Sequence, residues 1–130
     1  MPKQTLQHLE APLTIHSMAP NSPIPVEVTQ AELFFIAKTS DELSIVCPSD
    51  IDIDSDESES GWQTLEVLGP LGFSLTGIMS NISGVLAAAN ISIFAVSTFD
   101  TDYILVKDDS IEAAVKALRK SSYKVLSDSY

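Results

Sequence analysis

Basic residues are scarce in this chain of 130 residues. Seven lysines and arginines stand against 18 aspartates and glutamates, which gives a formal net charge of −11, and Arg119 is the only arginine. Proteins bind the phosphate backbone of nucleic acids through clustered lysines and arginines. We therefore expect no nucleic-acid partner.

Cysteines and long apolar runs are also few. Cys47 is the only cysteine, which excludes an internal disulfide and fits a reducing compartment, and we interpret it as a small buried apolar residue. No apolar run approaches the roughly 20 residues of a membrane span. The first 13 residues lack the apolar stretch of a signal peptide. These absences predict a cytoplasmic protein that does not contact a membrane.

Groups for catalysis and metal binding are sparse. His8 and His16 both lie near an N-terminus that we expect to be flexible, so the sequence offers neither a Ser/His/Asp set nor a histidine cluster for a metal. An acylphosphatase needs an arginine in the loop before its first helix, and the corresponding "GPLGFS" has none. We predict no enzymatic activity, no metal and no cofactor.

One acidic run is compared with a calcium-binding loop. Residues 50–61, "DIDIDSDESESG", have acids at the first, third, fifth and seventh positions. A calcium loop also needs glycine at its sixth position and glutamate at its twelfth, where this chain has Ser55 and Gly61. We expect a solvated loop, with weak cation binding by residues 50–59 left as an alternative.

The remaining sequence shows clear periodicity. Two apolar stripes have helical spacing: Leu75, Ile78, Met79, Ile82, Val85, Leu86 and Ala89, and then Ile111, Ala114, Val115 and Leu118. Asn90 is expected in a left-handed C-cap, and Asp109 with Glu112 is expected to form a capping box. Apolar or alternating runs predict strands at 33–38, 43–47, 62–69, 91–96, 103–106 and 123–127.

From residue 62 onward the order strand, helix, strand, strand, helix, strand predicts an α+β, ferredoxin-like fold. In it, both helices cover one face of a four-stranded antiparallel sheet. Residues 34–46 and 93–106 share a plan of strand, hydroxyl residues, acid and strand. With a cut-down strand at 13–15 before them, residues 12–60 are interpreted as an abbreviated relative of residues 61–130.

Several motifs carry a resemblance to a known family. The segments "DELSIVCPSD" and "GPLGFSLTGIMSNISGVLAAANISIFAVSTFDTDYILVKDDSIEAAVKAL", with Trp62 between them, resemble small bacterial ACT-domain proteins related to the CASTOR arginine sensors and to the regulatory ACT regions of aspartate kinases. The resemblance covers about residues 12–125. The family pattern has Asp where Gly72 stands and Gly where Ser122 stands. The resemblance implies a βαββαβ ACT fold and a non-catalytic module that senses a small molecule, usually an amino acid, between ACT units.

Two segments are predicted to hold that ligand. The first, 69–75, leads into a helix whose N-terminus offers unpaired N–H groups and about half a positive charge for a carboxylate. The second, 97–102, offers oxygen acceptors for an ammonium or a cationic side chain, with Asp102 favoured over Asp100 as the outward acid. Spacing alone favours ordinary turns at both places, and the resemblance favours a site. The predicted site residues are Leu71, Gly72, Phe73, Ser74, Ser97, Thr98, Phe99, Asp100, Thr101 and Asp102.

The predicted function is therefore an amino-acid-binding regulatory protein that forms a homodimer or a similar assembly. The alternative is a ligand-free dimerisation or interaction module with the same fold.

Overall fold

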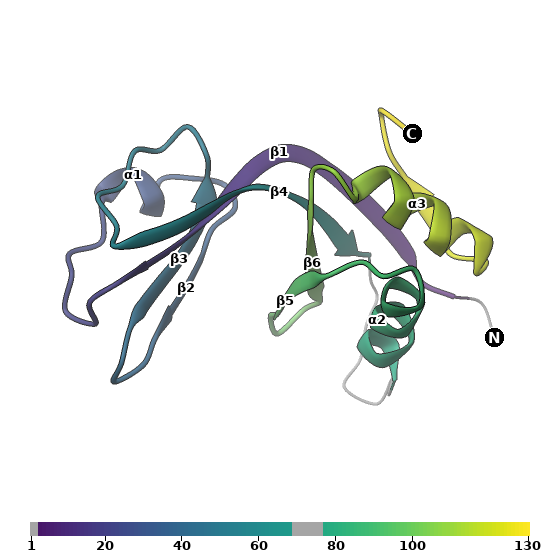
Figure 1. Cartoon of the computed structure of the whole chain (residues 1–130), viewed down its shortest axis with the longest axis horizontal. Helices are drawn as coiled ribbons and strands as arrows, with labels where there is room; N and C mark the ends of the chain where they lie inside the picture. The colour runs from purple at the N-terminus through teal and green to yellow at the C-terminus, as the bar shows by residue number, and fades with distance from the viewer. Residues whose placement is uncertain (1–2, 69–76) are drawn as a thin grey trace. The chain divides into compact units, whose positions relative to one another are not determined.

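The computed structural model describes residues 3–68 and 77–130. The chain divides into two compact units, a larger unit of Met1–Glu10 with Gln63–Tyr130 and a smaller unit of Ala11–Trp62. Strands β1 (Thr5–Met18) and β4 (Glu57–Val67) each run through both units (Figure 1). The expected flexible N-terminus and short strand at 13–15 were wrong, because β1 begins at Thr5 and pairs along most of its length.

The larger unit has the predicted order of elements after β4. These elements are α2 (Ile78–Ala88), β5 (Ile93–Ser97), β6 (Asp102–Lys107), α3 (Ile111–Lys120) and β7 (Lys124–Leu126). Its strands lie in the order β7, β1, β4, β6, β5, and β5 pairs antiparallel with β6 from Ile93↔Val106 to Ser97↔Asp102. This arrangement confirms the α+β fold with an antiparallel sheet and helices.

Strand β1 adds a feature that the sequence analysis did not predict. It lies between β4 and β7 and pairs with β7 in parallel, from Thr5↔Lys124 to Gln7↔Leu126. The short β7 therefore hydrogen-bonds to the beginning of the chain. Only the tertiary fold brings together segments so far apart in sequence.

The core of the larger unit lies between the sheet and the two helices. All four residues of the second predicted stripe, on α3, are buried, as are Ile82 and Leu86 on α2. Fully burying such a side chain stabilises the fold by about 1.5–3 kcal/mol. The buried residues of this core are Leu6, Leu65, Val67, Ile82, Leu86, Ile91, Ile104, Val106, Ile111, Ala114, Val115, Leu118, Tyr123 and Val125.

Both long helices end in the same hydrogen-bonded motif. Asn90 has φ 61°, as predicted, and the N–H of Ile91 bonds the carbonyl of Leu86 at 2.9 Å. At the end of α3, Ser122 has φ 73° and the N–H of Tyr123 bonds the carbonyl of Leu118 at 3.0 Å. These pairings satisfy carbonyls that the last helical turn would leave open.

The predicted capping box at the start of α3 was wrong. Ser110 is the N-cap residue and makes no side-chain cap hydrogen bond. Its hydroxyl instead donates to Oδ1 of Asp109 at 3.1 Å. The Asp109 carboxylate lies one residue before the capping position and is engaged by its neighbour.

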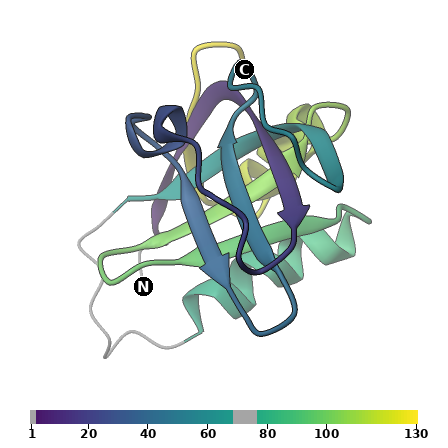
Figure 2. The same ribbon diagram turned by 90° about the vertical axis from the view of Figure 1, so that its left-hand side faces the viewer.

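The smaller unit is built on the second half of β1. Strand β3 (Leu43–Pro48) pairs antiparallel with β1 from Leu13↔Pro48 to Met18↔Leu43, and β2 (Phe35–Lys38) pairs with β3 (Figure 2). The two strands and the turn between them were predicted. A short helix, α1 (Val26–Thr29), begins directly after Pro25.

Two expectations for the smaller unit have clear outcomes. Cys47 is fully buried, which confirms its interpretation as a buried apolar residue. Burial raises the pKa of its thiol, and the charge of Asp50 raises it further.

The acidic run is not a loop throughout. Residues 57–60 are exposed on the first part of β4, where alternating glutamate and serine keep the charges in water.

Candidate functional site

The predicted segment 97–102 forms the closed end of the β5–β6 hairpin. Ser97 and Asp102 are its last cross-strand pair. Within the turn, the N–H of Thr98 bonds the carbonyl of Thr101 at 2.8 Å, and the N–H of Thr101 bonds Oγ1 of Thr98 at 3.2 Å. The Thr98 side chain therefore closes the turn locally, as threonines in turns often do.

The two aspartates of the hairpin have different environments. The Ser97 hydroxyl donates to Oδ1 of Asp102 at 2.5 Å, and Asp102 is half-buried. Asp100 is exposed at the tip of the turn. The sequence analysis favoured Asp102 as the outward acid, but Asp100 is the more exposed of the two because Asp102 belongs to the paired part of the hairpin.

The hairpin end is tied to the strand that leads into the other predicted segment. The Thr101 hydroxyl donates to the carbonyl of Val67, at the end of β4. Leu68 follows, and its N–H bonds the carbonyl of Thr5 at 2.8 Å. The chain thus enters the segment 69–76 from a point beside the hairpin. The predicted site residues Leu71, Gly72, Phe73 and Ser74 lie outside the described residues.

Helix α2 begins later than the start of its apolar stripe suggested. Its first residue is Ile78, and Gly77 precedes it with φ 78°, in the left-handed region that favours glycine. Among the residues that the structure describes, no side chain makes a cap hydrogen bond at that position.

Two residues that the sequence analysis did not select add to the hairpin end. The Tyr103 hydroxyl donates to Oε2 of Glu66 at 3.4 Å. Burial raises the pKa of the Tyr103 phenol, and the charge and hydrogen bond of Glu66 and the charge of Asp100 raise it further. Both residues could have been selected from the sequence by their positions. Tyr103 directly follows Asp102, and Glu66 lies on the polar side of the alternating strand that became β4.

The acids at the hairpin end have no basic neighbour in sequence. No lysine or arginine occurs between Lys38 and Lys107. Glu66, Asp100 and Asp102 therefore offer carboxylate oxygens as acceptors with no basic residue close to them in sequence. Carboxylates attract N–H groups that carry positive charge.

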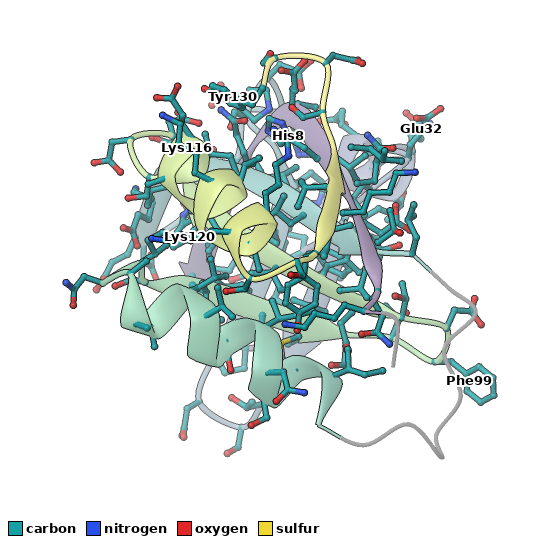
Figure 3. All side chains as sticks on the ribbon, turned by 90° about the vertical axis from the view of Figure 1, so that its right-hand side faces the viewer. His8, Glu32, Phe99, Lys116, Lys120 and Tyr130 are labelled. Carbon is teal, nitrogen blue, oxygen red and sulfur yellow. The ribbon has the colours of Figure 1, made fainter. Side chains whose placement is uncertain are left out.

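The hairpin tip also carries an exposed aromatic side chain. Phe99 is 82% exposed and extends away from the ribbon (Figure 3). Contact surfaces often include exposed apolar side chains, although single exposed ones are also common on proteins that make no such contact.

Neither a cluster of metal-ligand side chains nor a membrane-spanning helix occurs in the described part of the chain. Within residues 3–68 and 77–130, no three His, Cys, Asp or Glu side chains cluster as metal ligands would. No helix among these residues is long and apolar enough to cross a membrane. Both histidines lie on β1 and are buried, His8 at 4% and His16 at 6% exposure, so their expected place in a flexible end was wrong.

Two protein-family models match adjoining parts of the chain. A family model described as ACT domain matches residues 57–120, and a model described as an N-terminal domain matches residues 14–56. A crystal structure of a protein from Agobacterium tumefaciens is 32% identical, with a TM-score of 0.88, and the match covers 97% of this chain and 94% of that one.

Curated and more distant relatives extend the comparison. The human cytosolic arginine sensor for mTORC1 subunit 1 is 35% identical over 111 residues, which are 78% of this chain and 32% of the sensor. This chain therefore spans about a third of the length of that relative. The regulatory subunit of aspartate kinase from Thermus thermophilus shares the fold at 11% identity, with a TM-score of 0.60, covering 87% of this chain and 93% of that one.

Proposed function

The chain belongs to the ACT-domain family, and we propose that it is a regulatory protein that binds an amino acid or a related metabolite without catalysing a reaction. The observation that carries this proposal is the acidic end of the β5–β6 hairpin. There Asp100 is exposed, Asp102 is half-buried, and Glu66 approaches Tyr103 without a basic residue nearby in sequence.

The chemistry of this end suits the cationic part of an amino acid. An α-ammonium group or a cationic side chain would form charge-assisted hydrogen bonds with the Asp100 and Asp102 carboxylates and the Ser97, Thr98 and Thr101 oxygens. The relation to a protein named as an arginine sensor supports the same class of ligand. Arginine and lysine are therefore the first ligands to test.

The ligand carboxylate is assigned to the segment 69–75. Leu71, Gly72, Phe73 and Ser74 would hold it through backbone N–H groups, because the chain has only one arginine. This part of the proposal rests on the sequence and on the Thr101–Val67 contact, which anchors the strand leading into the segment.

We place the ligand at an interface between ACT units of two copies of the chain. The exposed Phe99 at the hairpin tip would then form an apolar wall contributed by one copy. If ligand and partner meet at the same place, binding and association are reciprocally linked. We further propose that the protein is cytoplasmic, that it needs no cofactor, and that it binds neither nucleic acid nor a membrane.

Thermal melting with each of the 20 amino acids tests the proposal. A ligand at 100 times its dissociation constant stabilises the native state by about 2.7 kcal/mol, so at least one amino acid should raise the melting temperature. Sedimentation at the same concentrations should show tighter association with that ligand. No shift with any amino acid would contradict the amino-acid proposal.

The exposure of Phe99 favours one alternative function, a dimerisation module that needs no ligand. It predicts that Phe99→Ser weakens self-association while none of the amino acids alters the melting temperature. Sedimentation velocity of the parent chain and of Phe99→Ser, each with and without arginine, separates the two functions.

A further inference from the structure

A buried histidine on β1 is hydrogen-bonded through both ring nitrogens. Nε2 of His8 lies 2.6 Å from Oε1 of Gln63 on β4, and Nδ1 lies 2.7 Å from the hydroxyl of Ser127, directly after β7. Nε2 of Gln63 donates to Oδ1 of Asp108 at 2.9 Å, which orients the amide so that its Oε1 faces His8. Because an amide oxygen can only accept, the proton of the neutral ring is on Nε2. Nδ1 of His8 is then an acceptor, and it receives the hydroxyl proton of Ser127.

The Ser127 hydroxyl uses its whole hydrogen-bonding capacity. Besides donating to His8, it accepts the N–H of Ser129 and the N–H of Tyr130, each at 3.2 Å. A hydroxyl has one proton and two lone pairs, so these three bonds fill it. The two bonds from main-chain N–H groups fold residues 127–130 into a turn. Ser127 therefore cannot accept a bond from His8 without losing one of them.

The turn carries the other contacts of this segment. The Ser129 hydroxyl donates to Oε1 of Glu10 on β1, and the Tyr130 ring stacks on His8 with centroids 5.9 Å apart (Figure 3). Nη2 of Arg119, on α3, donates to the main-chain oxygen of Tyr130 at 2.9 Å. All of these residues belong to the larger unit. The contacts hold the segment against β1 and α3 and help to bury His8.

Charged groups lie around this contact, but both ring nitrogens of His8 bond uncharged side chains. The acids Asp108 and Glu10 are bonded to partners of this contact, and Arg119 is bonded to the segment itself. The two acids attract a positive ring, whereas Arg119 repels it. Proton uptake by the ring would therefore act first on its own hydrogen bonds. The charged or titratable groups tied to this contact are Glu10, Asp108, Arg119, Tyr130 and the exposed Asp128.

We propose that residues 127–130 form a strap that the neutral ring of His8 holds in place and that proton uptake by the ring releases. A charged imidazole donates from both nitrogens. Nε2 keeps its bond to Gln63, whereas the new N–H on Nδ1 faces the Ser127 oxygen, whose lone pairs are already used. Three N–H groups then compete for two lone pairs, and the hydroxyl proton of Ser127 loses its acceptor. The strap must separate from His8 or lose its turn.

Release of the strap would uncover a histidine that is buried while the ring is neutral. Histidine is the side chain that ordinarily changes its charge between about pH 5 and pH 8, where most carboxylates stay ionised. The strap therefore responds to mild acidification without any ligand. This inference does not depend on the proposed function.

Nuclear magnetic resonance of the isotope-labelled chain tests the premise and the release together. At pH 7.5, the nitrogen spectrum of the imidazole rings should show His8 protonated on Nε2 alone. On acidification to pH 5, both of its ring nitrogens should become protonated. Over the same range, the heteronuclear Overhauser effect of the Ser129 and Tyr130 amides should fall to about half or less, because a released segment moves on the picosecond-to-nanosecond timescale.

The amide signals of Leu65 and Leu118, which are buried in the core of the larger unit, report whether the fold persists at each pH. Three outcomes would overturn the proposal. They are a neutral ring protonated on Nδ1, a ring that stays neutral down to pH 5 or until the protein unfolds, and strap amides that stay ordered once the ring is charged.

Two histidine variants separate the strap from general effects of acid. His16→Gln removes the only other histidine, and the strap should respond in it as in the parent. His8→Asn offers an amide oxygen as an acceptor for Ser127 but takes up no proton in this range. The Overhauser effect of its strap should therefore be the same at both pH values. A pH response that survives in His8→Asn would assign the release to another group and overturn the role of His8.

Discussion

Ser97 and Asp102 are cross-strand partners at the last rung of the β5–β6 hairpin, and their side chains are joined by a hydrogen bond of 2.5 Å. The bond occupies one carboxylate oxygen of Asp102. Asp100, three residues after Ser97, remains exposed on the turn. The two aspartates therefore differ in how much their removal should affect the fold and the binding of a cation.

The first prediction separates these two roles. Asp100→Asn should remove the stabilisation by a cationic amino acid and leave the stability of the free protein within about 0.5 kcal/mol, since it is an exposed substitution. Asp102→Asn should also weaken binding, and it should cost about 0.5–1.5 kcal/mol through the weakened bond to Ser97. Thermal melting with and without ligand measures both effects.

Asp41→Asn is the control for both variants. Asp41 lies in the turn of the other hairpin, between β2 and β3, and is also exposed. The ligand should stabilise this variant as much as the parent. Equal stabilisation of Asp100→Asn and the parent would contradict the role given to Asp100.

The second prediction concerns a serine in a left-handed conformation. Ser122 has φ 73°, where glycine has no steric penalty. Ser122→Gly should therefore stabilise the protein by about 0.5–1 kcal/mol, seen as a higher urea midpoint with an unchanged slope. Ser121→Gly, one residue earlier at φ −89°, should give no such gain. A lower midpoint for Ser122→Gly would contradict the account of this helix end.

The third prediction uses a buried hydroxyl without a partner. Oγ1 of Thr64 is buried and has no hydrogen-bond partner among the residues that the structure describes. Burying such a group costs free energy that valine, of the same shape, avoids, so Thr64→Val should stabilise the fold by about 1 kcal/mol. The hydroxyl of Thr14 bonds Ser49 at 2.8 Å, so the matched Thr14→Val should destabilise it by a similar amount. Urea unfolding measures both, and a loss of stability in Thr64→Val would count against this prediction.

The fourth prediction is a pH dependence that arises from His16. Burial lowers the pKa of His16 below its ordinary value of 6.5, and its Nδ1 lies 2.9 Å from the hydroxyl of Ser55. Because the unfolded chain takes up the proton first, the stability contributed by the neutral ring is complete above about pH 6.5. It is lost as the pH falls through the lowered pKa.

His16→Gln should therefore reduce the loss of stability between pH 7.5 and pH 5.5. The other acidic and basic groups are unchanged in this variant, so their effects cancel in the comparison. Urea unfolding of parent and variant at the two pH values gives the difference. An equal loss in both proteins would show that His16 does not contribute.

Much of the larger unit was predictable because its signals are local. The apolar stripe predicted each buried residue on α3, and Asn90 predicted the end of α2. Both predictions succeed because periodicity and helix-end conformation depend on residues within one or two helical turns. The β5–β6 hairpin was predictable for the same reason. Its acidic residues could be selected as candidates, but their division into a paired Asp102 and an exposed Asp100 required the strand register.

The sequence by itself determined the order of elements, the apolar faces of the helices and the acidic character of the hairpin, because each is encoded in neighbouring residues. The tertiary structure alone decided that β1 extends from Thr5 and separates β7 from β4, and that His8 is buried against the segment after β7. Those contacts join residues more than 100 positions apart, and pairing over such separations leaves no periodic mark in either segment. The insertion of the first strand between β7 and β4 is therefore a property of the folded chain.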